Sequence, residues 1–497
     1  MQPLPILIHS TAAIRAADRH AIEVLGIPGY TLMTRAGEAA LGALRAQWPL
    51  ARRILVLCGR GNNGGDGYVL ARYAQAAGLT VTVTAPAGPP ADGDAARAFR
   101  DWTATGGRTE PWSEALLAHA DLVVDALLGT GLTRSVEPPL AAVIASTNGA
   151  GRPVLALDTP SGLDTETGLP HGAAVHATLT ITFVGLKPGF FLGFGPEYVG
   201  RLACDDLDVP ASAFGSSGGV LRRITDADLR RALPQRARTS HKGTHGRVLV
   251  IGGGAGMAGA ARLAGEAALR AGAGLVTLAT WPAHAAAIAA SRPELICVGV
   301  EEPTALAALV AAADVVAVGP GLGRTAWASG LIEAAFATDR PLVVDADALN
   351  ALARAPVARG DWCLTPHPGE AGRLLATDAD SVQRDRLAAV RALVARYGGV
   401  AVLKGAGTLI AEPDQPAWVC ERGNPGMAAA GMGDVLTGVI AAIAAQQPER
   451  GRELGLAAAV GVLVHASAGD LAARAGERGL LATDLIAQLP ACVNPAS

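Results

Sequence analysis

The segment ILVLCGRGNNGGDG (54–67) decides the fold of the first part of this 497-residue chain. Its first half is a short apolar run, which is typical of a strand buried on both faces of a sheet. Its second half holds glycines and asparagines that can turn tightly, and a helical stretch follows from Tyr68 to Ala77. A buried strand, a glycine turn and a helix together predict one unit of a parallel α/β sheet.

The same order of strand, turn and helix recurs along the whole chain. LVVDALLG (122–129) and VLALDTPSG (154–162) are two further apolar runs, and both carry an aspartate at the expected strand end. The pattern restarts at RVLVIGGGAG (247–256) and continues through LVTLAT (275–280), DVVAVGPGLG (314–323), LVVDADAL (342–349) and VAVLKGAG (400–407). It predicts parallel sheets with helices on both faces. The break GSSGG (215–219) between the two series predicts two domains, residues 1–218 and 219–497.

Composition narrows the classes of partner and compartment. The net charge of −3 provides no basic field for a nucleic-acid backbone. The most apolar stretch, Gly455 to Val464, stops at His465, and we expect it to be too short to span a membrane. The N-terminus lacks the pattern of a secretory signal, and the six cysteines are widely spaced, which predicts reduced thiols in a cytoplasmic protein. The alanine-rich helices also favour a homo-oligomer.

Two glycine patterns look like dinucleotide fingerprints, Gly59-x-Gly61-x-x-Gly64 and Gly254-x-Gly256-x-x-Gly259. In a dehydrogenase an acidic residue ends the next strand and binds the ribose. Neither TVTVTAP (80–86) nor LVTLAT (275–280) contains one. An ordinary NAD-dependent dehydrogenase is therefore disfavoured, and the chain also contains no Walker A motif.

Lysine is rare in this chain, since only three of its 41 basic residues are lysines. They are Lys187, Lys242 and Lys404, and each lies in a turn that contains glycine. Because arginine serves elsewhere, we expect these positions to need a slim point charge. Chance placement on the surface is the competing interpretation.

Polar side chains follow three predicted strands of the first domain. GNNGGDG (61–67) can present backbone N–H groups to a phosphate at a helix start, and Asn63 adds a carbonyl oxygen. Asp125 and Asp158 end two strands, and Ser161 follows the second. Such ends meet at one edge of a parallel sheet, so they predict a hard-cation site with one formal charge, which favours K⁺ over Mg²⁺. Helix capping and turn formation are the alternative interpretation.

In the second domain, NPGMAAAGMGD (424–434) runs into an apolar helix. The backbone donors at that helix start would stabilise a phosphoryl group during transfer. Asp434 could accept a proton from a substrate hydroxyl, although a capping role would also suit it.

The first domain resembles the NAD(P)H-hydrate epimerase family over residues 10–210. The resemblance rests on GNNGGDG, DALLGTGL (125–132), DTPSGLD (158–164) and ADRHAIEVLGIPGYTLMTRAGEAA (17–40). It implies a Rossmann-like fold that interconverts the R and S epimers of hydrated NADH and NADPH at C6. It also implies Asn63, Asp125 and Ser161 as potassium ligands and a signature position for Lys187. Thr34 departs from the family, which commonly has an acidic residue or Asn there.

The resemblance also implies which residues contact the hydrated nucleotide in the first domain. They are Asn62, Asn63, Gly64, Gly65, Asp66, Gly129, Thr130, Gly131, Leu132, Thr133, Arg134, Ser135 and Asp158. We predict Asp158 as the acid/base residue, because epimerisation needs proton transfer near the hydrated carbon.

The second domain resembles the ribokinase-like superfamily and, within it, the NAD(P)H-hydrate dehydratases, over residues 225–490. The resemblance rests on KGTHGRVLVIGG (242–253), GAARLAGEAALRAGAGLV (259–276), GPGLGR (319–324), DADALNAL (345–352), TPHPGE (365–370), KGAGTLI (404–410) and the turn before Asp434. It implies phosphorylation of the hydrate hydroxyl by ADP or ATP with Mg²⁺, and Asp434 as the base. The S hydrate would then lose phosphate and become NAD(P)H.

The implied residues of this second site form two sets. Those around the adenine nucleotide are Lys404, Gly405, Ala406, Gly407, Thr408 and Gly433. Those around the hydrate are Ala260, Gly323, His367 and Asp434. Two alternatives stay open from the residues alone: a small-alcohol or vitamin kinase in the second domain, and a non-catalytic ligand-binding or interaction module in the first.

Overall fold

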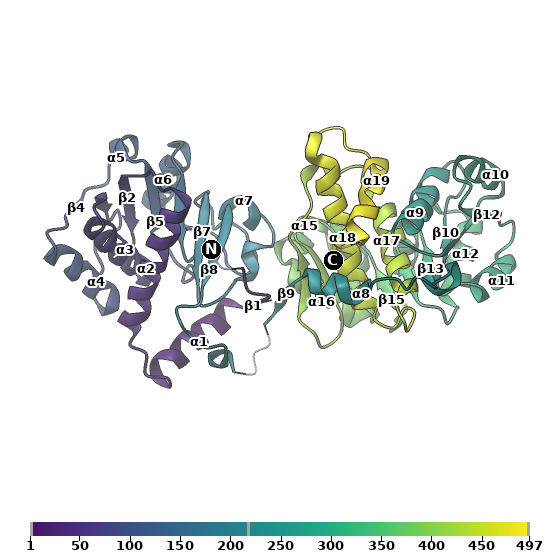
Figure 1. Ribbon diagram of the computed structural model, residues 1–497, viewed down its shortest axis with the longest axis horizontal. Coiled ribbons are helices and arrows are strands. Elements are labelled where there is room, and N and C mark those ends of the chain that lie inside the picture. The colour runs from purple at the N-terminus through teal and green to yellow at the C-terminus, as the bar shows by residue number, and fades with distance from the viewer. Residues whose placement is uncertain (1–2, 216–218, 495–497) are drawn as a thin grey trace. The chain divides into compact units, whose positions relative to one another are not determined.

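The computed structural model describes residues 3–215 and 219–494 (Figure 1). The chain divides into two compact units, Met1–Leu221 and Arg222–Ser497. The predicted domain boundary at residue 218 lies outside the described residues. β9 (Leu221–Arg223) spans the division between the units.

The first unit is built on a seven-stranded sheet. Its strands, in spatial order, are β4 (Thr109–Glu110), β3 (Thr80–Thr84), β2 (Arg53–Cys58), β5 (Leu122–Ala126), β6 (Val154–Leu157), β7 (Leu179–Phe183) and β8 (Arg201–Asp205). Every neighbouring pair is parallel. The chain leaves β2 toward β3 and later returns to β5 on the other side. A topological switch point, where α/β sheets bind ligands, therefore lies between β2 and β5.

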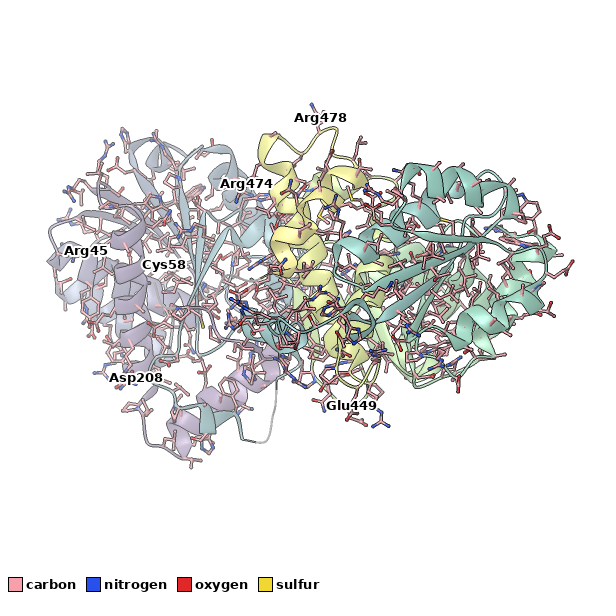
Figure 2. The ribbon with its side chains drawn as sticks, turned by 45° about the vertical axis from the view of Figure 1, so that its right-hand side comes forward. Arg45, Cys58, Asp208, Glu449, Arg474 and Arg478 are labelled. Atoms are coloured by element: carbon pink, nitrogen blue, oxygen red, sulfur yellow. The ribbon has the colours of Figure 1, made fainter. Side chains whose placement is uncertain are left out.

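Both faces of this sheet are covered, because side chains of β2 alternate between two cores. Ile54 and Val56 pack in a core with α2 (Gly29–Gln47) and α3 (Asn62–Ala76), whereas Leu55 and Leu57 pack in a core with α6 (Pro138–Gly149). Figure 2 shows Cys58 inside this unit and Arg45 on α2 outside its core. The remaining elements are β1 (Leu7–Ile8), α1 (Thr11–Glu23), α4 (Gly93–Ala104), α5 (Ala115–His119), η1 (Pro188–Phe190), α7 (Gly195–Val199) and η2 (Ala211–Phe214).

The second unit contains a larger sheet that is parallel through most of its width. Its strands run in the order β18 (Ala417–Cys420), β17 (Thr408–Ala411), β16 (Val400–Leu403), β15 (Trp362–Leu364), β14 (Leu342–Val344), β13 (Val315–Val318), β10 (Arg247–Ile251), β11 (Leu275–Thr280) and β12 (Ile296–Gly299). The predicted parallel pattern fails at β16–β17–β18, which pair antiparallel. Only residues 404–407 join β16 to β17, and this link is too short for a parallel crossover.

Helix α17 (Met432–Gln446) lies at the centre of the second unit and is buried along nearly its whole length. It packs against α9 (Ala258–Arg270), where a Cβ on Gly438 would lie 2.0 Å from the carbonyl oxygen of Ala264. The other elements are α8 (Asp226–Ala232), η3 (Lys242–His245), α10 (Pro282–Ser291), η4 (Pro303–Ala305), α11 (Leu306–Ala311), α12 (Ala326–Phe336), α13 (Ala346–Arg354), α14 (Pro368–Leu375), α15 (Ala379–Arg384), α16 (Arg386–Tyr397), η5 (Pro425–Met427), α18 (Leu454–Ala472), η6 (Ala473–Ala475) and α19 (Ala482–Val493).

The apolar stretch at 455–464 is longer in the structure than we predicted. It belongs to a helical segment, Leu454–Ala475, that is long and apolar enough to cross a membrane by length and composition. The prediction of insufficient length is therefore wrong, because the helix continues past His465. Of its most apolar window, 72% is buried inside the protein, where α18 packs against α17 and α19. Such burial is typical of a core helix.

Candidate active sites

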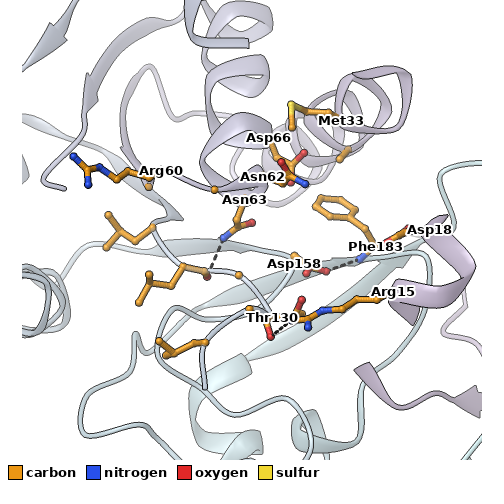
Figure 3. A pocket seen from close by; sticks show the side chains of 18 of the residues that line it. Arg15, Asp18, Met33, Arg60, Asn62, Asn63, Asp66, Thr130, Asp158 and Phe183 are labelled. Carbon is orange, nitrogen blue, oxygen red and sulfur yellow. Dashed lines mark hydrogen bonds between the residues drawn. The ribbon is translucent and has the colours of Figure 1, made fainter. Parts of the chain in front are cut away.

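A cavity of about 1000 Å³ opens at the switch point of the first unit (Figure 3). Its wall includes most of the residues that the epimerase resemblance implies: Asn62, Asn63, Asp66, Asp158 and all seven residues from Gly129 to Ser135. Gly64 and Gly65 lie in the same turn but not in the wall. A Cβ on Gly64 would lie 2.0 Å from the carbonyl oxygen of Gly59, so Gly64 permits the close turn between β2 and α3.

The start of α3 points backbone donors at this cavity. Gly61 precedes the helix and supplies no side-chain cap, so the first N–H groups stay free for an anion. Four arginines also line the wall, and they are Arg15, Arg19, Arg60 and Arg134. Of these, Arg15 donates a 2.6 Å hydrogen bond to the carbonyl oxygen of Thr130 and so ties α1 to the 129–135 loop. The cavity can therefore hold a large ligand that carries phosphates.

Asp158 follows β6 directly and has a left-handed backbone, with φ of 61°. A non-glycine residue rarely adopts this conformation, and such strain is concentrated at functional sites. The buried Lys187 places its Nζ 2.7 Å from Oδ1 of Asp158 and 2.5 Å from the hydroxyl of Thr182. The ion pair fixes the carboxylate of Asp158, which lies at the cavity wall (Figure 3).

Two further carboxyl groups share the cavity with Asp158. Burial, followed by the charge of Asp158, raises the pKa of Asp18 on α1 to about 6. Asp66 on α3 is buried, and burial together with the charges of Asp158 and Asp18 raises its pKa well above the usual range. Asp18 stands in the quoted segment 17–40, but nothing in that segment indicates that α1 reaches this wall.

A buried polar network adjoins the cavity: Asn63 belongs to the cavity wall, whereas Asp125 and Ser161 do not. Oδ1 of Asp125 accepts a 2.6 Å hydrogen bond from the Ser161 hydroxyl, and its Oδ2 accepts a 2.8 Å bond from the Ser161 amide. Asn63 donates from Nδ2 to the carbonyl oxygen of Leu128, while its buried Oδ1 has no hydrogen-bond partner among the described residues. Burial raises the pKa of Asp125 to about 6, although bonds from Ser161 oppose the shift. The predicted ligands Asn63, Asp125 and Ser161 are thus linked by hydrogen bonds through the loop that follows β5. Oδ1 of Asn63 has no partner among the described residues.

Thr34 does not disturb this site. Its hydroxyl donates a 2.7 Å hydrogen bond to the carbonyl oxygen of Tyr30 within α2, and the residue is not part of the cavity wall. The polar group of Thr34 is therefore satisfied within α2, and this departure from the family pattern leaves the cavity wall unchanged.

The second site lies where α17 begins, at the carboxyl ends of β14 and β16. Asp434 stands in the first turn of α17, after Gly431 in a left-handed conformation (φ 86°). Burial and then the charge of Asp345 raise the pKa of Asp434 to about 7, against the opposing charge of Lys404. A carboxyl group with this pKa can gain and lose a proton near neutral pH.

Asp345, which directly follows β14, accepts hydrogen bonds from three side chains of this site. Its Oδ1 accepts from Nζ of Lys404 at 2.8 Å and from the Thr365 hydroxyl at 2.9 Å, and its Oδ2 accepts from the Thr437 hydroxyl at 2.8 Å. A Cβ on Gly433 would lie 3.3 Å from Nζ of Lys404, so this lysine lies against the helix start. Lys404 keeps 19% of its side chain exposed, which lets a nucleotide reach it.

The other predicted hydrate-binding residues, Ala260, Gly323 and His367, connect to this site through their neighbours. His367 caps α14 by accepting from the amide of Gly369, and Glu370 of that helix lies 3.7 Å from Nζ of Lys404. The amide of Gly323 donates a 2.7 Å bond to Asp347, the second aspartate of DADALNAL. The loop of Gly323 also approaches α9 closely, since a Cβ on the nearby Gly321 would lie 2.8 Å from that of Ala260.

The KGAG turn (404–407) accepts hydrogen bonds from a buried arginine that we did not predict. Arg386 donates to the carbonyl oxygens of Leu403, Lys404 and Gly407 at 3.2–3.4 Å. Burial lowers its pKa to about 10. The predicted nucleotide residues Lys404, Gly405, Ala406, Gly407 and Thr408 thus form one braced turn, in which Thr408 bonds back to Gly405 at 2.7 Å.

Comparison with known proteins matches each of the two units to a family. The family described as NAD(P)H-hydrate dehydratase matches residues 248–491, and the YjeF-related protein N-terminus matches residues 29–189. The bifunctional NAD(P)H-hydrate repair enzyme of Coxiella burnetii is 48% identical over 98% of this chain and 100% of its own length. That of Escherichia coli is 45% identical over 97% of this chain and 93% of its own length. The chain belongs to the family of bifunctional NAD(P)H-hydrate repair enzymes.

Membership in the repair-enzyme family confirms the predicted pairing of an NAD(P)H-hydrate epimerase with an ADP/ATP-dependent dehydratase. The predicted α/β fold class is confirmed as well. A solved ribokinase-like superfamily protein from Enterococcus faecalis covers 55% of this chain and 95% of its own length, with 31% identity and a TM-score of 0.50. The alternative of a small-alcohol kinase with a non-catalytic first domain is not favoured.

Several residues that line or support the two candidate sites in the structure were missed by sequence reasoning. They are Asp18, Asp345, Asp347, Glu370, Arg386 and Thr437. Asp345 and Asp347 belong to DADALNAL, a quoted motif to which we gave no role, and the strand-end aspartate was the available signal. Of the three lysines, Lys187 and Lys404 lie in the two sites, whereas Lys242 is exposed in η3.

Proposed function

We propose that the first cavity epimerises hydrated NADH and NADPH with Asp158 as an acid/base group, and that the α17 site dehydrates the S hydrate with Asp434 as the base. The observation that carries the proposal is the convergence of residues far apart in sequence. Asn62, Asp66, the 129–135 loop and Asp158 line one cavity, and Lys404, Gly433 and Asp434 meet at one helix start.

In the first cavity, the start of α3 and the four lining arginines would hold the nucleotide's phosphates. Asp158 then lies beside the hydrated ring. Its pair with Lys187 keeps the carboxylate in one position, which is what proton transfer at a defined carbon requires.

A potassium ion fits the network under this cavity. The carboxylate of Asp125 is fully buried without a cationic partner among the described residues, and Asn63 has an acceptor oxygen left free. Asn63, Asp125 and Ser161 would hold the ion, which would supply the missing positive charge. The bound ion would also join the loop after β5 to the start of α3.

In the second site, the KGAG turn and Lys404 would bind the phosphates of ADP or ATP. The hydroxyl oxygen of the S hydrate attacks the terminal phosphoryl group, and Asp434 accepts the hydroxyl proton. Phosphate then leaves in place of hydroxide, a much poorer leaving group, and NAD(P)H results. The α17 backbone donors and Lys404 stabilise the transferring charge.

Magnesium also fits the second site. Asp345, Asp347, Glu370 and Asp434 together carry more negative charge than Lys404 balances. No described group of three or more His, Cys, Asp or Glu residues could hold a metal alone, so the ion would enter with the nucleotide's phosphates. It would neutralise developing charge on those oxygens.

The test is to give the full chain a mixture of R and S hydrated NADH, ADP or ATP, and Mg²⁺. Absorbance of reduced nicotinamide should return, and free phosphate should be released in equal amount. Accumulation of a stable phosphorylated product would instead indicate a kinase. The same assay with each donor and with hydrated NADPH decides donor and coenzyme preference. Assembly into a homo-oligomer stays a prediction.

A further inference from the structure

Helix α1 brings a carboxyl group to the first cavity that no predicted motif assigned. Asp18 is half-buried and lines the same wall as Asp66 and Asp158 (Figure 3). It comes from α1, whereas Asp158 follows β6, so the two groups reach the cavity from different elements. The structure gives no hydrogen bond or ion pair to Asp18 among the described residues.

The charges around Asp18 favour retention of a proton. Burial and the charge of Asp158 raise the pKa of Asp18 to about 6, and Lys187 and Arg19 lower it. Asp66 lines the same cavity, and the buried Lys187 is already bonded to Asp158. A half-buried carboxyl group beside another negative charge keeps its proton to a higher pH than a solvated one does.

We propose that Asp18 is a second catalytic acid/base residue of the epimerase and shares one proton with Asp158. The inference rests on the proposed function of the cavity. An exchange of epimers that keeps the ring closed releases the hydroxyl from one face of C6 and adds water to the other face. Two proton-transfer groups that reach the cavity from different elements, α1 and the end of β6, can serve the two faces of the ring.

The proposed step balances as follows. The C6–O bond breaks as the ring nitrogen N1 donates its lone pair, and Asp18 gives its proton to the departing hydroxyl, which leaves as water. A water molecule then adds to the opposite face of C6 and gives a proton to Asp158, and N1 regains its lone pair. The reverse reaction uses the same groups with their roles exchanged, so no oxidant or reductant is needed.

Asp18 suits this role better than Asp66. Asp66 is only 9% exposed in the tightly packed first turns of α3, next to the start that would bind phosphate. Asp18 is more exposed, and its pKa of about 6 lets it act both as acid and as base near neutral pH.

The test measures R-to-S exchange by the full chain without nucleotide, so that dehydration cannot occur. We expect Asp18→Asn to slow exchange roughly 10²-fold or more, and Asp18→Glu to retain part of the rate. In the wild type, kcat/KM for exchange should fall as pH rises through about 6, because the acid form of Asp18 is lost, and Asp18→Asn should lack this limb. Oxygen-18-labelled water should enter the C6 hydroxyl once per exchange.

Glu23→Gln is the matched control, because Glu23 is an exposed carboxylate of the same helix outside the cavity wall. It should exchange at the wild-type rate. A wild-type exchange rate in Asp18→Asn would overturn the inference. The inference would also be overturned if the variant were slow and the first unit unfolded at a lower temperature. If Asp158→Asn loses exchange while Asp18→Asn does not, only this inference fails. If Asp158→Asn also exchanges normally, the proposed function of Asp158 fails.

Discussion

Asp158 and Asp345 occupy matching places in the two units, but they differ in what they face. Each directly follows a parallel strand and pairs with a lysine, at 2.7 Å to Lys187 and at 2.8 Å to Lys404. A left-handed residue marks each turn, Asp158 itself in one unit and Ala346 in the other. In the first unit the lysine is fully buried and the aspartate faces the cavity, whereas in the second the aspartate is buried and the lysine is partly exposed.

The difference follows from the chemistry of each site. In the proposed function, an epimerase needs a carboxylate at the reacting carbon, so the strand-end aspartate would react and its lysine would support it. A phosphoryl-transfer site needs a cation at the nucleotide, so the lysine would be presented and the aspartate would support it. The proposed reacting carboxylate of that site, Asp434, stands at the start of α17.

The largest expected effect separates the two reacting aspartates. Asp434→Asn should abolish dehydration of the S hydrate and leave R-to-S exchange intact, and Asp158→Asn should do the reverse. Loss of an acid/base group costs about 10²–10⁴-fold in rate. With a mixture of both hydrates, Asp158→Asn should repair the S fraction quickly and then slow to the spontaneous exchange rate. Normal dehydration by Asp434→Asn would show that Asp434 is not the base.

The two lysines should differ in how much they stabilise the fold. Lys187→Met leaves Asp158 without its buried cation, so the first unit should lose about 3–5 kcal/mol of unfolding free energy. Lys404→Met should cost less, about 1–3 kcal/mol, because Asp345 keeps bonds from Thr365 and Thr437.

Calorimetry of the full chain, with a transition for each unit, measures this difference. Lys242→Met is the matched control, since Lys242 is the third lysine and is exposed. It should leave both transitions unchanged. Equal losses in the Lys187 and Lys404 variants would contradict the comparison.

A pH profile tests the influence of Asp345 on the base. Because the pKa of Asp434 is raised to about 7, its base form is lost as pH falls through about 7, and kcat/KM for dehydration should fall with it. Asp345→Asn removes a negative charge beside Asp434, so this limb should move down by roughly one pH unit. The exposed Asp339→Asn should leave the limb in place. An unmoved limb in Asp345→Asn would refute the electrostatic link.

The smallest expected effect concerns potassium. Exchange of K⁺ for a bulky organic cation should slow epimerisation and lower the first unfolding transition by a few degrees, about 2–4 °C per kcal/mol of lost binding. Asp125→Asn should make that transition insensitive to K⁺. Equal stabilisation by Mg²⁺, or short octahedral contacts to a divalent ion in a crystal, would argue against a monovalent site.

The sequence by itself determined the family, the α/β class and the strand ends at which polar residues gather. Apolar runs, glycine turns and helical stretches are local signals, and strand ends in parallel sheets share one edge, so Asp125 and Asp158 could be chosen without coordinates. Asp434 could be chosen because a glycine-rich turn precedes the apolar helix in which it stands. The tertiary structure decided which side chains meet. Lys187 and Asp158 are 29 residues apart, and Lys404 and Asp345 are 59 apart. Such pairs depend on sheet order and register.

Two other features of the protein became visible only in the tertiary structure. The link between β16 and β17 made the sheet edge antiparallel, although VAVLKGAG reads like the other strand-and-turn segments. Asp18 reached the cavity only because α1 lies beside the 129–135 loop, where Arg15 bonds to Thr130. From the sequence alone, an aspartate on a helix is expected to be solvated. The burial that raises the pKa of Asp18, and the charge of Asp158 that adds to it, exist only in the folded protein.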